Sequence, residues 1–521
     1  MIKIKDMMKR TLAGLMLALF VMQAQAQTAV NAEKGAEKYA ATITKEDLHD
    51  YLSVLASDAL EGRETGERGQ KMAAAFIQHH FEELGLQGPV KDQGNGYLQK
   101  VVLFSGKPGN IYVKARGQTY KNYEDIVYMG SGHTNAEKTV SLVFAGKGEE
   151  QDYEKINVKD KAVLILTDDW TKYRGLSARA RKKGAHAVFF VAAATQAAHQ
   201  ALVQNLRERM ESHPTLRLQR PDMAVAQENI ATGAFFISPE AAANIMGTSF
   251  QKLQEAAQEA GNKKLAKQKP AALSFQLTHE LDTVMSENVL GYLEGGDKKD
   301  ELLVITAHYD HIGRDGEHIN NGADDDGSGT SAVMELAEAF VQAKKEGKGP
   351  RRSILFMLVT GEEKGLLGSE YYAANPIFPL KNTVVNLNID MIGRIDPQHE
   401  GNPDYVYLVG SNRLSTELHD ISERTNTTYT NLKLDYTYND ENHPDRIYYR
   451  SDHWNFAKNG IPVIFYFNGV HADYHKPSDT IDKIEFDALQ KRAQLVFYTA
   501  WELANRDGRP VVDKAPAQSN P

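Results

Sequence analysis

The most constraining feature of this 521-residue sequence is a series of apolar runs that lie close together along its second half. From residue 285 onward, nearly continuous apolar runs at 302–307, 353–359, 384–389 and 461–466 alternate with helical patterns. Runs of this kind are typical of parallel strands that are buried on both faces. Strands that alternate with helices predict an α/β domain with a mixed, mostly parallel central sheet and helices on both faces.

Groups that can bind metal or transfer protons follow these runs. His308 comes directly after the first run, and Asp390 ends the third. Glu362 and Glu363 follow the second run after a Thr-Gly turn. His475 lies in a loop beyond the fourth. Open α/β sheets bind their ligands at the carboxyl ends of the strands, so these distant residues can converge on one site.

Two imidazoles and several carboxylates are the donor set that a pair of divalent metal ions needs. The Gly-rich turn at 322–329 (Gly-Ala-Asp-Asp-Asp-Gly-Ser-Gly) can bend sharply and bring the short Asp325 side chain inward. We expect this carboxylate to bridge both ions, with Asp324 or Asp326 supporting the turn. An EF-hand-type calcium loop is disfavoured, because alternating acids and the downstream Glu are missing. The predicted ligands are His308, Asp325 and Asp390 for one ion, and Asp325, Glu363 and His475 for the other.

Two further carboxylates have predicted supporting roles. Adjacent side chains of an extended segment point in opposite directions, so Glu363 can bind metal while Glu362 acts as general base. The Asp310 carboxylate is expected to accept the second ring N–H of His308 and so fix its tautomer. Zinc is the expected metal, and manganese or cobalt are alternatives. We find no strand-associated Gly-rich nucleotide motif that would indicate an organic cofactor.

Composition excludes several other classes of protein. The hydrophobic fraction of 41% and the charged fraction of 25% describe a folded globular chain, and its length predicts two or three domains. The net charge of −9 and the lack of a basic cluster argue against nucleic acid as a partner. The sequence contains no cysteine, which excludes disulfides, thiolate zinc sites and a cysteine nucleophile.

The N-terminal residues predict export. Basic residues precede an apolar run at 12–22, and small residues follow at 24–26 (Ala-Gln-Ala). This order is typical of a secretory signal peptide, here residues 1–26 with cleavage after Ala26. A membrane anchor is the weaker alternative, because the run is shorter than the ~20 residues that span a bilayer. The mature chain is therefore expected to be periplasmic or secreted and to have no membrane span.

The ordered motifs resemble those of the di-zinc aminopeptidase family, which includes bacterial leucyl-type aminopeptidases and glutamate carboxypeptidase. The motifs are residues 307–311 (Ala-His-Tyr-Asp-His), 322–329, 361–363 (Gly-Glu-Glu), 388–391 (Asn-Ile-Asp-Met) and 474–480 (Tyr-His-Lys-Pro-Ser-Asp-Thr). The resemblance implies hydrolysis of a terminal peptide bond, in which metal-bound hydroxide attacks the carbonyl. It assigns Glu362 as the group that takes the proton and delivers it to the leaving amine. In some relatives a Tyr steadies the oxyanion, and Tyr474 is the candidate here.

The same resemblance organises the rest of the chain. Residues 27–109 look like the N-terminal part of a peptidase domain that continues at 281–507, although 61–66 (Glu-Gly-Arg-Glu-Thr-Gly) can also be read as a plain connector. Residues 110–280 contain short β-rich runs and no metal-ligand constellation, and they resemble an inserted protease-associated domain. The Pro- and Ala-rich tail at 508–521 is expected to be disordered.

The predicted function is that of an exported di-zinc aminopeptidase that releases N-terminal residues from peptides. A carboxypeptidase or a dipeptidase with the same metal centre is an alternative. A different class is a non-catalytic, receptor-like binding domain, as in the transferrin-receptor ectodomain. A relative with one zinc ion, glutaminyl cyclase, is a further comparison. The complete set of predicted ligands argues against both of these last possibilities.

Overall fold

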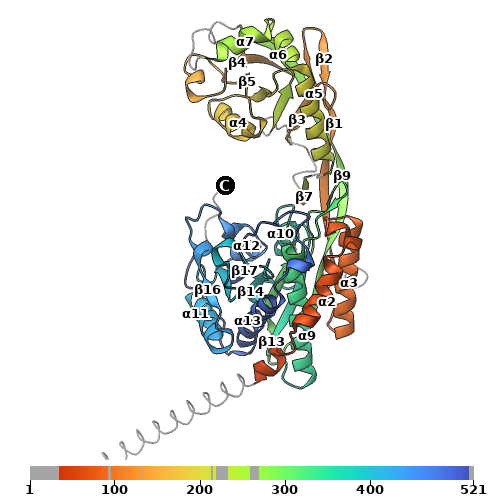
Figure 1. Ribbon diagram of the computed structural model, residues 1–521, viewed down its shortest axis with the longest axis vertical. Coiled ribbons are helices and arrows are strands. Elements are labelled where there is room, and N and C mark those ends of the chain that lie inside the picture. Colours follow the sequence, from red (N-terminus) through yellow and green to blue (C-terminus); the bar gives the residue numbers. More distant parts are fainter. Residues whose placement is uncertain are drawn as a thin grey trace, which may run out of the picture. The chain divides into compact units, whose positions relative to one another are not determined.

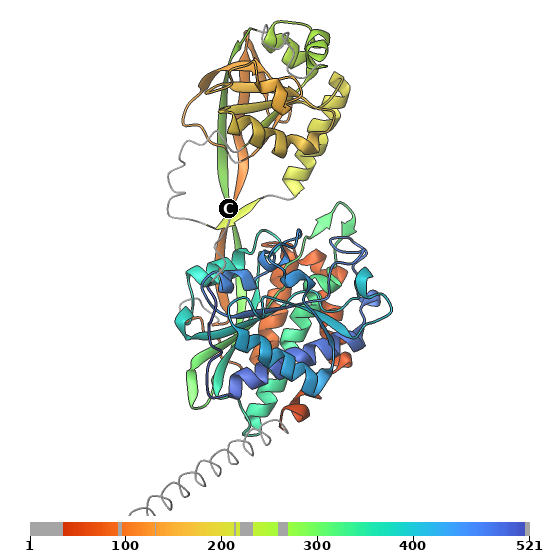
Figure 2. The same ribbon diagram turned by 90° about the vertical axis from the view of Figure 1, so that its left-hand side faces the viewer.

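The computed structural model describes residues 35–91, 96–130, 132–212, 215–218, 233–258 and 269–515. The predicted signal peptide at 1–26 lies outside these residues. The chain divides into two compact units, which Figure 1 and Figure 2 show from two directions. Unit 1 comprises Met1–Val102 and Met285–Pro521, and unit 2 comprises Leu103–Val284. Within the described residues, no helix is both long enough and apolar enough to cross a membrane.

The division between the units falls inside two long strands, β1 (Leu98–Ala115) and β9 (Ala271–Leu293). The boundaries expected at 110 and 280 lie within these strands rather than between elements. Turn signals could not locate the division, because both strands continue through it without a turn.

Unit 1 is built on a mixed sheet in the order β16-β15-β17-β14-β10-β13-β9. Its strands besides β9 are β10 (Lys298–His308), β13 (Arg352–Val359), β14 (Thr383–Ile389), β15 (Tyr405–Val409), β16 (Lys433–Asp435) and β17 (Val463–Phe467). The central strand β10 pairs in parallel with β13 and β14, and β14 pairs in parallel with β17. Only β9 against β13 and β15 against β17 are antiparallel in this order. The predicted mostly parallel sheet is confirmed.

Helices cover both faces of this sheet (Figure 1). Alternate residues of β10 enter different cores: Leu303 and Ile305 pack in one, and Leu302 and Val304 in the other. The first core also contains residues of α2 (Lys45–Leu55), α3 (Arg68–Leu84), α9 (Gly329–Lys345), α11 (Thr416–Thr425) and α13 (Phe486–Asn505). The second contains residues of α10 (Leu367–Ala374) and α12 (His453–Ala457). Burial on both faces explains why the strands read as unbroken apolar runs.

In unit 2 the strand order continues from the first part of β9 through β4-β5-β6-β8-β3. These strands are β3 (Ile126–Met129), β4 (Lys138–Phe144), β5 (Ala162–Leu166), β6 (Ala187–Val191) and β8 (Ala234–Ile237). Strand β1 also pairs with β2 (Gln118–Lys121) and β7 (Leu216–Leu218). The unit contains α4 (Tyr173–Lys182), α5 (Gln196–Ser212), α6 (Pro239–Met246) and α7 (Phe250–Ala257) as well. It therefore combines its strands with helices and encloses separate apolar cores.

The C-terminal segment differs from the expected disordered tail. Residues 511–514 lie along the start of α11: the Asp513 carboxylate accepts the Thr416 N–H at 3.0 Å, and Val511 N–H donates to the Glu417 carboxylate at 2.8 Å. The structure thus gives these residues defined contacts, where composition predicted a disordered tail. Composition shows that this C-terminal segment has no apolar core of its own. It does not show that Asp513 accepts the Thr416 N–H at the start of α11. Residues 516–521 lie outside the described residues.

Helix α9 carries a buried carboxyl group, that of Glu335. The Glu335 side chain is 1% exposed, and its oxygens receive no well-aligned hydrogen bond from a described residue. Burial, with the nearby charges of Glu338 and Asp47, raises the pKa of Glu335 to about 9 from an ordinary 4.5. The folded chain thus binds this proton more tightly than the unfolded chain does. Stability from this group is complete below about pH 4.5 and is lost as the pH rises through 9.

Replacing Glu335 by Gln should remove this pH dependence. The amide cannot ionise, so the variant should unfold at a higher temperature than the wild type at pH 9 and at nearly the same temperature at pH 5. Each kcal/mol corresponds to about 1–2 °C in a domain of this size. Thermal unfolding followed by circular dichroism across this range measures the difference. Melting curves of the two proteins that differ equally at all pH values would contradict the assignment.

Candidate metal centre

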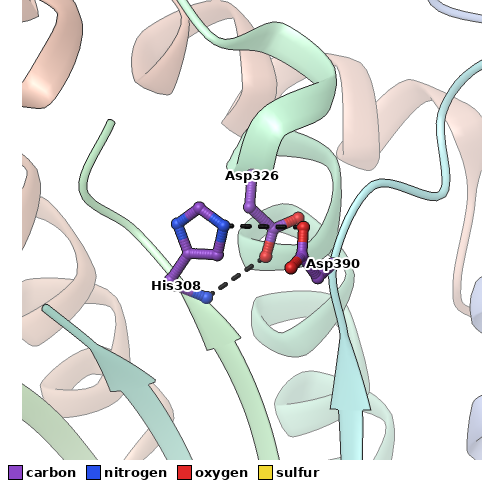
Figure 3. Close-up of side chains that lie close together, drawn as sticks. All are labelled: His308, Asp326 and Asp390. Atoms are coloured by element: carbon purple, nitrogen blue, oxygen red, sulfur yellow. Dashed lines mark hydrogen bonds and ion pairs between the residues drawn. The ribbon is translucent and has the colours of Figure 1, made fainter. Parts of the chain in front are cut away.

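The five predicted ligands lie together at the carboxyl ends of the unit 1 strands. His308 is the last residue of β10, and its Nε2 lies 3.2 Å from Asp325 Oδ1 and 3.5 Å from Asp390 Oδ1. Figure 3 shows His308 and Asp390 facing each other from neighbouring strands. These three side chains form the first half of the site.

The second half is arranged around the other oxygen of the same carboxylate. His475 Nε2 lies 3.1 Å from Asp325 Oδ2 and 3.2 Å from Glu363 Oε2. Asp325 therefore presents one oxygen to each half, as the bridging role requires. The grouping agrees with the predicted division, and the role of these residues as metal ligands stays a prediction.

The chemistry of the donors fits divalent cations. Asp325 Oδ2 and Glu363 Oε1 are buried and receive no well-aligned hydrogen bond from a described residue. Buried charges are paired or bind metal, because their desolvation is otherwise too costly. Imidazole nitrogens with carboxylate oxygens suit zinc, and they also accept manganese or cobalt. These residues could hold two such ions.

Asp326 lies in the same cluster but has a different task. Its carboxylate accepts the backbone N–H groups of His308 at 3.1 Å, Gly329 at 2.9 Å and Met391 at 3.0 Å. Figure 3 shows it between His308 and Asp390. Because backbone donors use both of its oxygens, Asp326 fixes the segments that carry the ligands. It holds the end of β10, the start of α9 and the residue after Asp390 together.

Two more carboxylates shape the Gly-rich turn. Asp479 Oδ2 accepts the backbone N–H groups of Asp324 at 3.0 Å and Asp325 at 3.2 Å. Asp324 Oδ1 in turn accepts the N–H of Gly393 at 2.6 Å. Both neighbours of Asp325 thus support the turn, where the sequence predicted that one of them would.

The segment 61–66 is more than a connector, and that alternative is wrong. The buried Arg63 guanidinium donates to the carbonyl oxygens of Tyr309 at 2.8 Å, Asn321 at 2.6 Å and Gly322 at 3.0 Å. It therefore joins the residues after β10 to the turn that carries Asp325. Burial lowers the pKa of Arg63, while the surrounding carboxylates oppose that change.

The expected contact between the Asp310 carboxylate and the His308 ring is wrong in detail. His308 Nδ1 lies 3.0 Å from the backbone carbonyl oxygen of Asp310, but 3.9 Å from its Oδ1. The carboxylate instead accepts the Thr65 hydroxyl at 2.7 Å and the Glu362 N–H at 3.2 Å. The chain bends after β10, so the carbonyl and not the side chain reaches the ring. Asp310 still fixes the ring of His308, and its side chain also positions Glu362.

Glu362 and Glu363 diverge as predicted, but for a different reason. Gly361 has φ of +68°, and the Glu362 carbonyl accepts the Gly365 N–H at 2.8 Å, so the pair lies in a turn and not in an extended segment. Glu362 Oε2 lies 3.9 Å from His308 Nε2, while Glu363 lies against His475. The turn directs the Glu362 carboxylate to the first half of the site and the Glu363 carboxylate to the second half.

Burial and neighbouring charges act differently on these groups. Burial, reinforced by the carboxylates of Asp390 and Glu363, raises the pKa of Glu362 well above its ordinary value. Burial would also raise the pKa of Glu363, but the His311 and His475 imidazoles lower it to about 2. The carboxylates of Asp325 and Glu363 outweigh burial and raise the pKa of His475 to about 10. The carboxylates of Asp325 and Glu363 therefore favour positive charge in the second half of the centre.

A pocket opens beside the centre. Its polar wall contains Asp325, Glu362 and Asp390, and its remaining lining residues are Met391, Ile447, Arg450, Phe465, Phe467, Val470 and Tyr474. The Tyr474 ring stacks on His475 with centroids 3.9 Å apart. Burial raises the pKa of Tyr474 and keeps its hydroxyl a donor. The structure thus places this predicted residue in the pocket wall next to the centre.

No role was predicted for His311, and the structure brings this residue to the centre. Its Nδ1 lies 2.8 Å from Glu363 Oε1. The motif at 307–311 contained the residue, but the spacing from His308 alone did not indicate where its side chain points.

Comparisons with known proteins agree with this geometry. The family model "Peptidase family M28" matches residues 288–500. This part of the chain belongs to peptidase family M28. A probable leucine aminopeptidase of Arthroderma otae is 33% identical over 215 residues, which cover 40% of this chain and 55% of that protein. The chain thus spans about half the length of this relative. Aminopeptidase YwaD of Bacillus subtilis is 24% identical over 89% of this chain and 86% of its own length.

Solved structures share the fold. An aminopeptidase from Aneurinibacillus sp. strain AM-1 has a TM-score of 0.53 at 18% identity, covering 92% of this chain and 98% of that chain. BSAP, a zinc aminopeptidase from Bacillus subtilis, has a TM-score of 0.50 at 19% identity, covering 91% and 98%. The family match begins at residue 288, so the resemblance of unit 2 to a protease-associated domain stays a prediction.

Zinc should stabilise the purified chain, and a chelator should remove that effect. A ligand at a hundred times its dissociation constant adds about 2.7 kcal/mol to the free energy of unfolding, or about 3–5 °C in a domain of this size. Thermal unfolding with EDTA and with added zinc measures the shift. Equal melting temperatures, with no zinc found in the protein by elemental analysis, would contradict a metal centre at this site.

Proposed function

We propose that this chain is an exported di-zinc aminopeptidase that hydrolyses N-terminal residues from peptides. The observation that carries the proposal is the position of Asp325, with one carboxylate oxygen directed to each half of a five-residue donor set. The M28 match and the names of its relatives, leucine aminopeptidase and zinc aminopeptidase, support the reaction class.

The residues around the donor set suit peptide hydrolysis. When bound, two divalent cations would polarise the scissile carbonyl and acidify the attacking water. Glu362 lines the pocket, accepts the proton of this water and delivers it to the leaving amine. Burial and the neighbouring carboxylates of Asp390 and Glu363 raise its pKa, which strengthens it as a proton acceptor. Tyr474, on the same wall, is placed to donate to the oxyanion.

The pocket also suggests which substrates fit. Most of its wall away from the donor set is apolar, with Ile447, Phe465 and Phe467 among its residues. Apolar pockets bind apolar side chains by removing their surface from water. We infer a preference for peptides with a large apolar N-terminal residue.

One pocket residue favours a second candidate. The exposed Arg450 guanidinium lies among the lining residues, and a guanidinium is suited to bind a carboxylate. That feature would suit a dipeptidase or a carboxypeptidase with the same centre. Hydrolysis of aminoacyl chromogenic substrates beside N-blocked dipeptides separates the possibilities, because only an aminopeptidase requires the free amine.

Replacing Glu362 by Gln should keep the metal ions but reduce kcat by about 10²–10⁴-fold, because the proton acceptor is lost. Elemental analysis and turnover of a leucyl chromogenic substrate measure the two properties. The exposed Glu400 offers a matched control, and its replacement by Gln should change neither. Near wild-type turnover in the Glu362 variant would contradict the assignment of the base.

We further propose that the chain is exported to the periplasm or the medium, on the basis of the signal-peptide pattern at 1–26. Expression of the full sequence in a bacterial host should give a mature chain that begins at Gln27. Mass spectrometry of the fractionated cells identifies this end. An uncleaved chain retained in the cytoplasm would contradict the export proposal.

A further inference from the structure

His311 is tightly packed next to the second half of the centre. Its side chain is 0% exposed, and its backbone N–H donates to the Arg63 carbonyl at 3.1 Å. The imidazole packs on Gly322, where an added Cβ would lie 2.6 Å from the ring carbon Cγ. The same turn carries Asp325, so the ring and the bridging carboxylate are positioned together.

The contacts of the ring lead to Glu363. His311 Nδ1 lies 2.8 Å from Glu363 Oε1 and 3.8 Å from Asp325 Oδ2. The ring also meets that of His475 edge-on, with centroids 5.8 Å apart and an interplanar angle of 70°. His311, Asp325 and Glu363 thus form a compact group of donor atoms on their own.

The distances between donor atoms distinguish metal ligands from positioning residues within this group. Two ligand atoms of a tetrahedral zinc ion, each about 2.0–2.1 Å from the metal, lie about 3.3 Å from each other. His475 Nε2 fits this value, at 3.1 Å from Asp325 Oδ2 and 3.2 Å from Glu363 Oε2. The 2.8 Å between His311 Nδ1 and Glu363 Oε1 is shorter, and it is the distance of a close imidazole–carboxylate ion pair.

We propose that His311 is a positioning residue for Glu363: its Nδ1 pairs with the Glu363 Oε1 atom and leaves Oε2 directed at the second cation. The inference rests on the proposed function, because it assumes a two-metal centre. The first half of the site, at His308 and Asp390, has no contact with this ring among those described. Loss of the imidazole should therefore weaken one of the two ions selectively. Residues that orient a ligand in this way typically contribute 10–100-fold to metal affinity.

The test compares His311→Leu with His311→Asn in the full-length mature chain. Leucine fills the space but has no donor, whereas the asparagine amide can place an N–H near the position of Nδ1. Zinc bound at buffered free concentrations gives the affinity of each ion, and the visible spectrum of the cobalt-substituted chain reports the geometry of the second. His318→Leu, at an exposed histidine of β12 (His318–Ile319), is the matched control.

The wild type and the His318 variant should bind two ions. His311→Leu should bind the first ion normally and the second 10–100-fold more weakly, and His311→Asn should recover most of that loss. His311→Gln places its amide near Nε2 and should resemble the leucine variant, which keeps the test decisive if the leucine variant does not fold. Melting curves in chelator establish that each variant is folded.

Wild-type affinity for the second ion in both His311→Leu and His311→Gln would overturn the inference, and so would an asparagine variant as weak as these. If His311 were itself a ligand of the second ion, the asparagine variant would bind that ion as weakly as the leucine and glutamine variants do. The proposed function fails separately: a wild type that binds two ions and cleaves no peptide would contradict it without affecting the role of His311. A wild type that binds a single ion would overturn both.

Discussion

The burial of negative charge at the carboxyl ends of β10 and β14 is the constraint on which the rest of unit 1 depends. Asp310, Asp324, Asp326 and Asp479 lie with the predicted ligands where water cannot solvate them. An isolated buried carboxylate is too costly to keep, so each needs a donor or a cation. Backbone amides and hydroxyls donate to each of these supporting carboxylates. Among the predicted ligands, Asp325 Oδ2 and Glu363 Oε1 have no such donor.

This distribution distinguishes residues of the same type. Asp326 and Asp390 lie side by side in Figure 3, and both approach His308. Asp326 uses both oxygens on backbone N–H groups, whereas Asp390 lies 3.5 Å from the imidazole with an oxygen directed at it. The Asp326 carboxylate thus holds the backbone segments in place, and the Asp390 carboxylate remains available to bind a cation. Rotation of the Asp326 side chain would break hydrogen bonds to three backbone segments, so the site is fixed before any substrate arrives.

Much of this arrangement could be predicted from the sequence, because buried parallel strands and a metal donor set both leave strong local patterns. The apolar runs located the central strands, and the groups that follow them proved to converge. Contacts between distant segments left no such pattern. Three such contacts depend on how the chain bends after β10 and at Gly361. They are the hydrogen bonds from Arg63 to backbone carbonyls, the contact of the Asp310 carbonyl with the His308 ring, and the contact of His311 with Glu363. The division of the units inside β1 and β9 and the contacts of residues 511–514 with α11 likewise leave no local sequence pattern.

The centre also explains why the chain before the insertion belongs to the same unit as the chain after it. The M28 match covers 288–500 and contains every predicted ligand, yet the frame that holds them reaches outside it. Arg63 joins the carbonyl oxygens of Tyr309 and Gly322, and Thr65 anchors the Asp310 carboxylate. A buried arginine without these carbonyls, or the carbonyls without it, would leave polar groups unpaired at a cost of about 1–3 kcal/mol each. The ligand-bearing segment therefore requires the N-terminal segment for its geometry, and unit 2 is inserted between two parts of one folding unit.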